Sequence, residues 1–181
     1  GITNTPAIIP YLQVKKENME RWAKRLPVKK LKVGLSWQGN PSYETDYLRS
    51  IPFSALIPLI ENTEAEFVSI QKENTAEVNP TMSRILNLGP ELDEADSFID
   101  TAAVIMHLDL IITSDTASAH LAGALGKPVW VLLKSAPDWR WQVKSEDTPW
   151  YPTMRLFRQT SPGDWTTVVK EVTTALKKFF S

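Results

Sequence analysis

The sequence predicts an α/β domain in which a single parallel sheet is doubly wound, with helices on both of its faces. Residues 109–114 (DLIITS) and 129–133 (VWVLL) are dominated by apolar side chains, which is typical of strands covered on both sides. The segments between such strands carry helical patterns, and strands that alternate with helices favour a parallel sheet. The length of 181 residues fits one such domain.

The N-terminal 27 residues are expected to lie outside this sheet. Residues 1–13 hold two prolines and no hydrophobic period, which indicates a linker or docking arm. In residues 15–26 apolar side chains recur at helical spacing, and Pro27 is expected to end that helix. We therefore divide the chain into an arm with a helix, residues 1–27, and a domain, residues 28–181.

The elements of the domain are assigned from apolar runs, periodicity and stop signals. A helix over residues 52–61 would start with a proline, but Pro58 inside it predicts a kink or a short first turn. Helices are also expected over residues 99–108 and 115–126, with Gly126 as the residue that stops the second. The expected strands, in chain order, are 31–36, 66–70, 84–89, 109–114, 129–133 and 154–158.

The C-terminal helix has the clearest pattern. Ser161 is expected to cap it, and Pro162 fits its first position. One continuous apolar stripe then predicts a helix that packs against the sheet. The stripe consists of Val168, Val169, Val172, Ala175, Leu176, Phe179 and Phe180.

Composition excludes several classes of function. The 20 basic and 21 acidic residues give a formal net charge of −1, which argues against nucleic acid or an anionic membrane as a partner. The chain has no cysteine, which excludes thiol chemistry and fits a cytoplasmic location. With only His107 and His120 as histidines, no metal centre is expected, and no cofactor either. The apolar runs are shorter than the ~18 residues that span a bilayer.

The most informative loop follows the strand at residues 109–114. That strand leads directly into Asp115 and Thr116, and the next helix begins at once. The first turn of a helix carries unpaired N–H groups and about half a positive charge, which makes it an anion site. The small side chain of Ala117 leaves room for a phosphate, and His120 lies on the same face. The alternative is that Ser114 or Asp115 only caps the helix and that His120 is an ordinary, partly buried histidine.

Two further loops follow strands on the same edge of the expected sheet. Arg49, in the long polar loop after the first strand, could bind a phosphate through its forked guanidinium. After the second strand come Gln71, Lys72 and Glu73, where Glu73 could accept from ribose hydroxyls and Lys72 could offset phosphate charge. Solvated loops without a ligand are the alternative for both segments.

Seven tryptophans are present, and four of them fall at Trp130, Trp139, Trp141 and Trp150. Core packing explains most such residues, and a rim for a sugar or a docking face is the alternative. No G-x-G-x-x-G, G-x-x-x-x-G-K-[ST] or G-x-S-x-G motif occurs, so dinucleotide, P-loop and nucleophile-elbow chemistry lack their usual signals.

A resemblance to a known family emerges from several motifs taken in order. VGLSWQGNP, LRSIP, FVSIQKE, DLIITSDTASAHLAGALGKPVWVLL, APDWRW and PWYP resemble the C-terminal, Rossmann-like half of GT-B glycosyltransferases. The chain is most similar to the heptosyltransferase-like (family 9) domain of bacterial tetratricopeptide-repeat proteins. The similarity spans about residues 30–160.

The resemblance implies a site for a nucleotide-sugar donor. In the family, an Asp-Thr-Gly-x-x-His stretch holds the donor diphosphate at a helix N-terminus, and here Asp115, Thr116 and His120 match it. Ala117 replaces the glycine and leaves slightly less room. The hydroxyl residue after the first strand corresponds to Ser36, the basic residue of the long loop to Arg49, and the acidic nucleoside contact to Glu73.

The resemblance also implies that a second half is needed for catalysis. GT-B enzymes place the acceptor and the catalytic base in an N-terminal half, and the reaction proceeds without a required metal. We therefore expect this chain to bind a nucleotide-sugar but not to transfer the sugar alone. Residues 1–26 would connect it to that half or to tetratricopeptide repeats. The alternatives are a non-catalytic docking module derived from a GT-B half and one half of a nucleotide-sugar epimerase.

Overall fold

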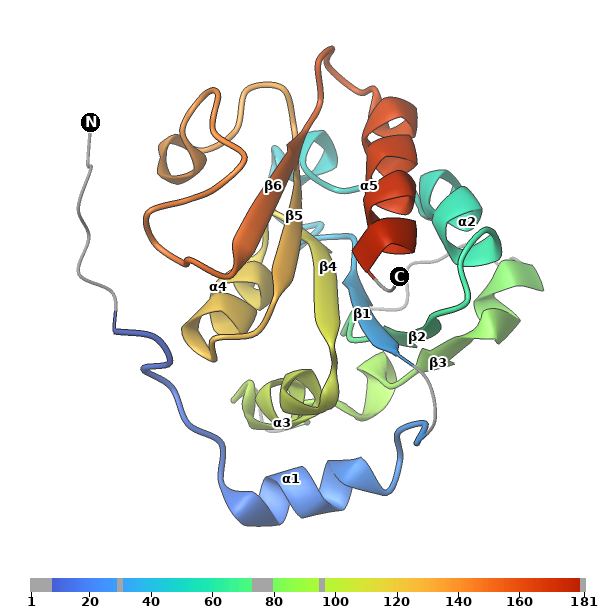
Figure 1. The fold of residues 1–181 in the computed structure, drawn as a ribbon, viewed down its shortest axis with the longest axis vertical. Helices are drawn as coiled ribbons and strands as arrows, with labels where there is room; N and C mark the ends of the chain where they lie inside the picture. Colours follow the sequence, from blue (N-terminus) through green and yellow to red (C-terminus); the bar gives the residue numbers. More distant parts are fainter. Residues whose placement is uncertain (1–7, 29–30, 73–79, 95–96, 180–181) are drawn as a thin grey trace.

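The computed structural model describes residues 8–28, 31–72, 80–94 and 97–179, and its sheet confirms the predicted fold class (Figure 1). Six parallel strands form one sheet in the order β3-β2-β1-β4-β5-β6. The strands are β1 (Lys32–Ser36), β2 (Glu66–Ser69), β3 (Ile85–Asn87), β4 (Leu110–Ser114), β5 (Val129–Leu133) and β6 (Met154–Arg158). The α-helices are α1 (Lys16–Ala23), α2 (Phe53–Glu61), α3 (Ile99–His107), α4 (Ala117–Ala124) and α5 (Trp165–Phe179).

The strand order reverses between β1 and β4, which lie at the middle of the sheet. Their carboxyl ends are adjacent, with Ser36 of β1 in register with Thr113 of β4. In open α/β sheets, ligands bind in the crevice outside the carboxyl ends at such a reversal. The topology therefore places the candidate site between the loops that follow Ser36 and Ser114.

Helices cover both faces of the sheet and create two separate cores. Helices α3 and α4 pack on one face, and α2 and α5 pack on the other (Figure 1). The short α1 lies on the outer side of α3, where Trp22 is buried and donates from Nε1 to Asp100 Oδ1 at 3.0 Å. Among the described helices, none is both long and apolar enough to cross a membrane.

Several helix ends differ from the sequence-based prediction. Helix α4 begins at Ala117 rather than at residue 115, because Thr116 is still extended at its N-cap. The α1 helix ends at Ala23, before Pro27 can act as its stop. In α2, Pro52 is the N-cap rather than the first residue, and the helix continues through Pro58.

Helix α5 also begins later than predicted, and its cap is a different residue. The Asp164 carboxylate accepts a hydrogen bond of 3.0 Å from the backbone N–H of Thr167, as an N-cap does. Ser161 belongs to the preceding turn, in which its carbonyl accepts from Asp164 N at 3.1 Å. Gly163 has a φ of +80°, which a turn tolerates and a helix does not. The helix therefore cannot start at Pro162.

The described part of the N-terminal arm crosses the C-terminal end of α4. The backbone N–H groups of Tyr11 and Leu12 donate to the carbonyl of Ala124 at 3.1 and 3.3 Å. Gly126 ends the helix with a φ of +73°, as the sequence predicts for a residue in that position. A Cβ on Gly126 would lie 3.3 Å from Ile9, so the arm packs closely against this turn.

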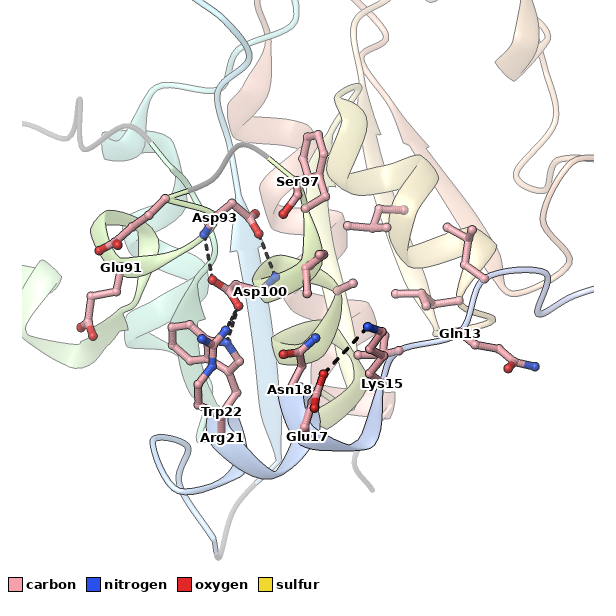
Figure 2. Close-up of a pocket in the computed structure, with 18 of the residues that line it drawn as sticks. Gln13, Lys15, Glu17, Asn18, Arg21, Trp22, Glu91, Asp93, Ser97 and Asp100 are labelled. Carbon is pink, nitrogen blue, oxygen red and sulfur yellow. Dashed lines mark hydrogen bonds and ion pairs between the residues drawn. The ribbon is translucent and has the colours of Figure 1, made fainter.

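A groove of about 1020 Å³ lies between the arm, α1 and the N-terminal end of α3 (Figure 2). Asp100 is the centre of its polar contacts, because its carboxylate accepts from Arg21, from Trp22 and from the backbone N–H of Asp93. Asp93 in turn accepts from the backbone N–H of Asp100 at 2.8 Å. None of the predicted site residues that the structure describes lines this groove.

Candidate functional site

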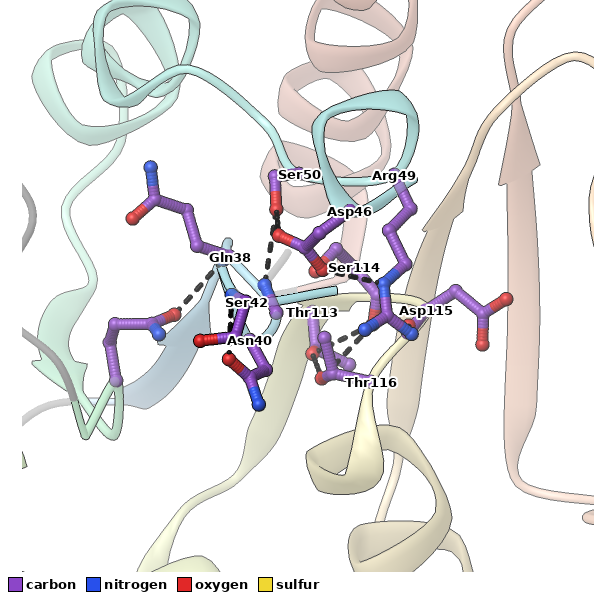
Figure 3. Close-up of polar contacts among 12 residues, drawn as sticks. Gln38, Asn40, Ser42, Asp46, Arg49, Ser50, Thr113, Ser114, Asp115 and Thr116 are labelled. Carbon is purple, nitrogen blue, oxygen red and sulfur yellow. Dashed lines mark hydrogen bonds and ion pairs between the residues drawn. The ribbon is translucent and has the colours of Figure 1, made fainter. Parts of the chain in front are cut away.

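The predicted anion site lies at the carboxyl end of β4, where the strand runs into α4 (Figure 3). The hydroxyl of Thr113 lies 3.2 Å from that of Thr116 and donates to the carbonyl of Ser114 at 3.0 Å. Thr116, the N-cap of α4, makes no side-chain bond to the helix, so capping does not consume the first N–H groups.

The first turn of α4 combines free donors with small side chains. By the geometry of an α-helix, the N–H groups of Ala117 and Ser118 find no acceptor within their own helix. The Ala119 N–H is satisfied by the Thr116 carbonyl at 3.0 Å. Ala117 is exposed, whereas Ser118 is buried. Two backbone N–H groups at the carboxyl end of β4 therefore lack an acceptor within the helix, at the positive end of its dipole.

The long loop after β1 is ordered by the carboxylate of Asp46. This buried group accepts from Arg49 Nε at 2.8 Å and from the hydroxyl of Ser50 at 2.5 Å. The Ser50 hydroxyl in turn accepts from the backbone N–H of Gly39 at 3.1 Å. Only glycine fits there, because a Cβ would lie 2.0 Å from an oxygen of Asp46.

Arg49 is brought to the α4 turn, as the sequence suggests for a phosphate ligand. Its Nη1 donates to the backbone carbonyl of Asp115 at 2.9 Å (Figure 3). Its charge is also paired with Asp46, and its guanidinium lies 5.4 Å from the ring centre of Tyr43. A ligand would therefore meet an arginine whose charge is already partly neutralised.

His120 points into an aromatic cluster that spacing along the sequence does not reveal. Its ring stacks on the buried Trp141 at 5.2 Å between centres with a 24° tilt, and its Nδ1 lies 3.2 Å from the hydroxyl of Tyr151. Burial lowers the pKa of His120, although the nearby carboxylate of Asp115 acts in the opposite direction. The histidine is therefore held mainly neutral at pH 7.

Trp141 and Tyr151 lie in the motifs APDWRW and PWYP, which carry part of the family resemblance. The sequence predicts core packing for Trp141 and assigns no role to Tyr151. In the structure both contact His120, on another element. Trp141 lies after β5 and Tyr151 lies just before β6, so no local sequence pattern signals that both contact His120. The neighbouring Trp139 is 65% exposed, and its ring meets that of Trp150 edge-on at 6.1 Å.

The residues predicted to contact the nucleoside occupy different environments. Gln71 is buried, and its Oε1 accepts from the backbone N–H groups of Trp37 and Gln38 at 3.1 and 3.0 Å. The hydroxyl of Ser36 donates to the same oxygen at 3.4 Å.

Through these hydrogen bonds, Gln71 links the end of β2 to the end of β1. Its contact with a nucleoside stays a prediction. Lys72 donates from Nζ to the carbonyl of Asp93 at 3.4 Å. Glu73 lies outside the described residues.

Three comparisons relate the chain to known proteins. A family model described as glycosyltransferase family 9 (heptosyltransferase) matches residues 57–162. Protein FlbA of Caulobacter vibrioides is 30% identical over 152 residues, which is 82% of this chain and 25% of FlbA.

Two solved structures share the fold. The Escherichia coli ADP-heptose lps heptosyltransferase II matches with a TM-score of 0.64 and 17% identity, over 98% of this chain and 56% of that one. A family 9 glycosyl transferase from Veillonella parvula matches with a TM-score of 0.60 and 13% identity, over 92% and 45% respectively. The chain thus spans a quarter to about half of the length of these relatives.

Proposed function

The chain belongs to glycosyltransferase family 9, the heptosyltransferase family, and from this membership we propose that it binds the diphosphate of a nucleotide-sugar donor at the N-terminus of α4. The observation that carries the proposal is the pair of free backbone donors at Ala117 and Ser118, at the carboxyl end of β4. They follow β4, at the point where the strand order reverses, which is where ligands bind in open α/β sheets. A diphosphate is the part of such a donor that a helix N-terminus recognises.

The groups around this turn suit an anion that is held mainly by neutral donors. Arg49 is paired with Asp46, and the carboxylate of Asp115 stands beside the turn, so bulk positive charge is low. Backbone N–H groups, the helix dipole and the imidazole of His120 supply the attraction instead. Each hydrogen bond to a charged phosphate oxygen contributes about 1.5–3 kcal/mol.

In the complete protein, the same groups would assist transfer of the sugar. We propose an inverting displacement at the anomeric carbon, in which the acceptor oxygen forms the new bond and the nucleoside diphosphate leaves with the electron pair. The α4 dipole, His120 and Arg49 would stabilise the charge on that leaving group. The acceptor site and the base that takes the acceptor's proton are assigned to a second half, outside these 181 residues.

Three residues after β2 are proposed to contact the nucleoside: Gln71, Lys72 and Glu73. Gln71 and Lys72 follow β2 at the same carboxyl edge of the sheet as the α4 turn, as a nucleotide that contacts both places requires. The larger protein would contain the second GT-B half or tetratricopeptide repeats. Relatives that extend well beyond the chain are consistent with such a parent.

Calorimetric titration with UDP, ADP and GDP, and with their common sugar conjugates, tests the donor site. We expect saturable binding of one nucleotide, about tenfold weaker or more in His120→Gln. His107→Gln is the matched control, because His107 donates from Nε2 to the Met19 carbonyl at 2.8 Å, between α3 and α1. A double variant, Asp115→Ala with His120→Ala, should abolish binding while the chain stays folded.

Two results would contradict the proposed donor site, and a third would contradict the assignment of catalysis to a second half. Unchanged affinity in the double variant would mean that the site lies in another loop. A folded chain that binds none of the nucleotides would favour the docking module, for which the exposed Trp139 offers a surface. Sugar transfer by these 181 residues alone would refute the assignment of the base and the acceptor site to a second half.

A further inference from the structure

Three polar groups from three segments form a chain of hydrogen bonds that ends at His120. The hydroxyl of Tyr11, in the N-terminal arm, lies 3.3 Å from the hydroxyl of Tyr151. The hydroxyl of Tyr151 lies 3.2 Å from Nδ1 of His120. The arm is thereby linked to the proposed diphosphate site through one buried tyrosine.

The fold makes specific room for this chain of contacts. Gly123 lies on α4 one turn after His120, and a Cβ there would approach the Tyr151 ring to 2.6 Å. Tyr151 is only 8% exposed as a result, and its hydroxyl is directed along α4 toward the imidazole. The other side of the His120 ring system is held by the stacked Trp141. The imidazole therefore has little freedom to rotate.

The positions of the protons follow from the donor and acceptor strengths of the three groups. An unprotonated imidazole nitrogen is a stronger acceptor than a phenol oxygen, and a phenol is a good donor. Tyr151 O–H therefore donates to Nδ1 of His120, and Tyr11 O–H donates to the Tyr151 oxygen. A hydrogen bond accepted by one ring nitrogen places the proton on the other.

We propose that Tyr151, oriented by Tyr11, holds His120 as the neutral tautomer protonated on Nε2 and so fixes the N–H that is presented to the donor diphosphate. The inference rests on the proposed function, and it makes both tyrosines positioning residues. The charged groups that face His120 are Asp115 and the Asp138–Arg140 ion pair. Asp115 and Asp138 favour the protonated imidazole, while burial and Arg140 favour the neutral one.

The arrangement also couples the arm to the site. Tyr11 is held in place by its backbone N–H, which donates to the Ala124 carbonyl, so its hydroxyl reaches Tyr151 only while the arm is docked. Release of the arm would leave the Tyr151 oxygen without this donor and would weaken the polarisation of its O–H toward His120. Placement of the preceding segment thus affects the affinity for the diphosphate.

Nitrogen NMR of the chain labelled with 15N-histidine measures the tautomer directly, without any ligand. The chain has two histidines, so His107→Gln assigns the remaining signals to His120. At pH 8 we expect His120 to show an unprotonated Nδ1 with the shift of a hydrogen-bond acceptor, and a protonated Nε2. A protonated Nδ1 in the wild type would overturn the inference.

Tyrosine-to-phenylalanine variants remove the hydroxyl groups and keep the rings, so they test the hydrogen bonds alone. Tyr151→Phe should move the Nδ1 shift toward that of a free acceptor and raise the pKa of His120, because the donor that favours the neutral form is lost. Tyr11→Phe should produce the same changes at smaller amplitude. Tyr47→Phe removes a phenol that is 74% exposed and should leave the His120 signals unchanged. Unchanged signals in Tyr151→Phe would also overturn the inference.

Titration of the same variants with ADP, UDP, GDP and pyrophosphate connects the tautomer to binding. Tyr151→Phe should weaken binding about threefold to tenfold. If the wild type binds a nucleotide but His120 carries its proton on Nδ1, the positioning role is refuted and the proposed function remains. If the wild type binds none of the probes, the proposed function is refuted, and with it the role of the N–H.

Discussion

The guanidinium of Arg49 donates a hydrogen bond of 2.9 Å to the backbone carbonyl of Asp115, which joins the loop after β1 to the turn after β4. The same guanidinium contacts the carboxylate of Asp46 through Nε at 2.8 Å. One side chain thus fixes the spacing of the two loops on either side of the crevice. Its structural role is present before any ligand binds.

Replacement of Arg49 by lysine should therefore destabilise the chain even though the charge is kept. An ammonium group cannot contact Asp46 and the Asp115 carbonyl in the same forked geometry. We expect the free energy of unfolding to fall by about 1–2 kcal/mol in urea titrations followed by tryptophan fluorescence. Arg155→Lys, at an exposed ion pair with Glu146, should stay within about 0.5 kcal/mol of the wild type. Equal effects of the two substitutions would contradict the structural role.

Gln71→Ala should also lower stability, because the backbone N–H groups of Trp37 and Gln38 lose their acceptor. Buried donors that are left unsatisfied cost about 1–3 kcal/mol. Gln13→Ala, at an exposed position in the arm, is the matched control and should change little. If Gln71 served only the nucleoside, its substitution would weaken nucleotide binding and leave the urea midpoint unchanged.

The elements that the sequence predicts best are those whose boundaries are set by local signals. The bounds of β5 and β6 are the predicted ones, since β5 is a short apolar run and β6 is a short segment with an exposed Arg155 among buried apolar residues, each bounded by turns. The start of α4 is two residues later than predicted. Asp115 and Thr116 are both acceptable capping residues, and the extended backbone of Thr116 decides between them.

The candidate site was predictable only in part, for a physical reason. The turn at Asp115 and Thr116 follows from a strand that runs directly into a helix. The contacts of His120 with Trp141 and Tyr151 instead join positions 21 and 31 residues apart, which only tertiary packing brings together. Likewise, Gln71 carries the polar pattern of a ligand contact, but burial commits its oxygen to the backbone of the neighbouring loop.

A larger side chain at Ala117 should block the proposed diphosphate site while sparing the fold. Ala117 is the exposed first residue of α4, so a β-branched side chain there would stand over the free N–H groups. We expect Ala117→Val to weaken nucleotide binding about tenfold, the loss of one hydrogen bond to a phosphate.

Ala23→Val, at the exposed end of α1, is the matched control for this substitution and should not change the dissociation constant. Calorimetry with the preferred nucleotide gives the comparison. Equal binding by Ala117→Val and the wild type would mean that the phosphate does not approach this turn.

Stability should depend on pH through His120. Burial lowers the pKa of His120 in the folded chain, so the unfolded chain, with an ordinary pKa of about 6.5, binds the proton more readily. Above that ordinary pKa, the neutral imidazole makes its full contribution to the free energy of unfolding. This contribution is lost as the pH falls toward the lowered pKa of the folded chain.

Urea titrations between pH 5 and 7.5 should therefore show a free energy of unfolding that rises with pH. His120→Gln removes the titrating group and should flatten this part of the profile. An unchanged slope in His120→Gln would contradict this role of the buried imidazole.

The structure and the sequence-based prediction differ in the N-cap of α5, which is Asp164 rather than Ser161. Asp164 accepts from the backbone N–H of Thr167, and hydrogen bonding by the side chain and then the backbone of Thr167 lowers the pKa of the Asp164 carboxyl. Asp164→Ala should lower the melting temperature at pH 7 by about 2–4 °C, the usual effect of losing an N-cap in a chain of this length. Ser161→Ala, at the residue that the sequence pattern favours as the cap, should leave the melting temperature unchanged.

The pH dependence of the difference between Asp164→Ala and the wild type shows whether Asp164 acts as a charged cap. A carboxylate with a lowered folded pKa stabilises the chain above its ordinary pKa, and the effect is lost as the pH falls through the folded value. The difference between Asp164→Ala and the wild type should therefore disappear in acid. A difference that persists with the carboxyl protonated would show that the side chain acts through packing rather than as a charged cap. A larger effect of Ser161→Ala at pH 7 would move the start of α5 back to Pro162.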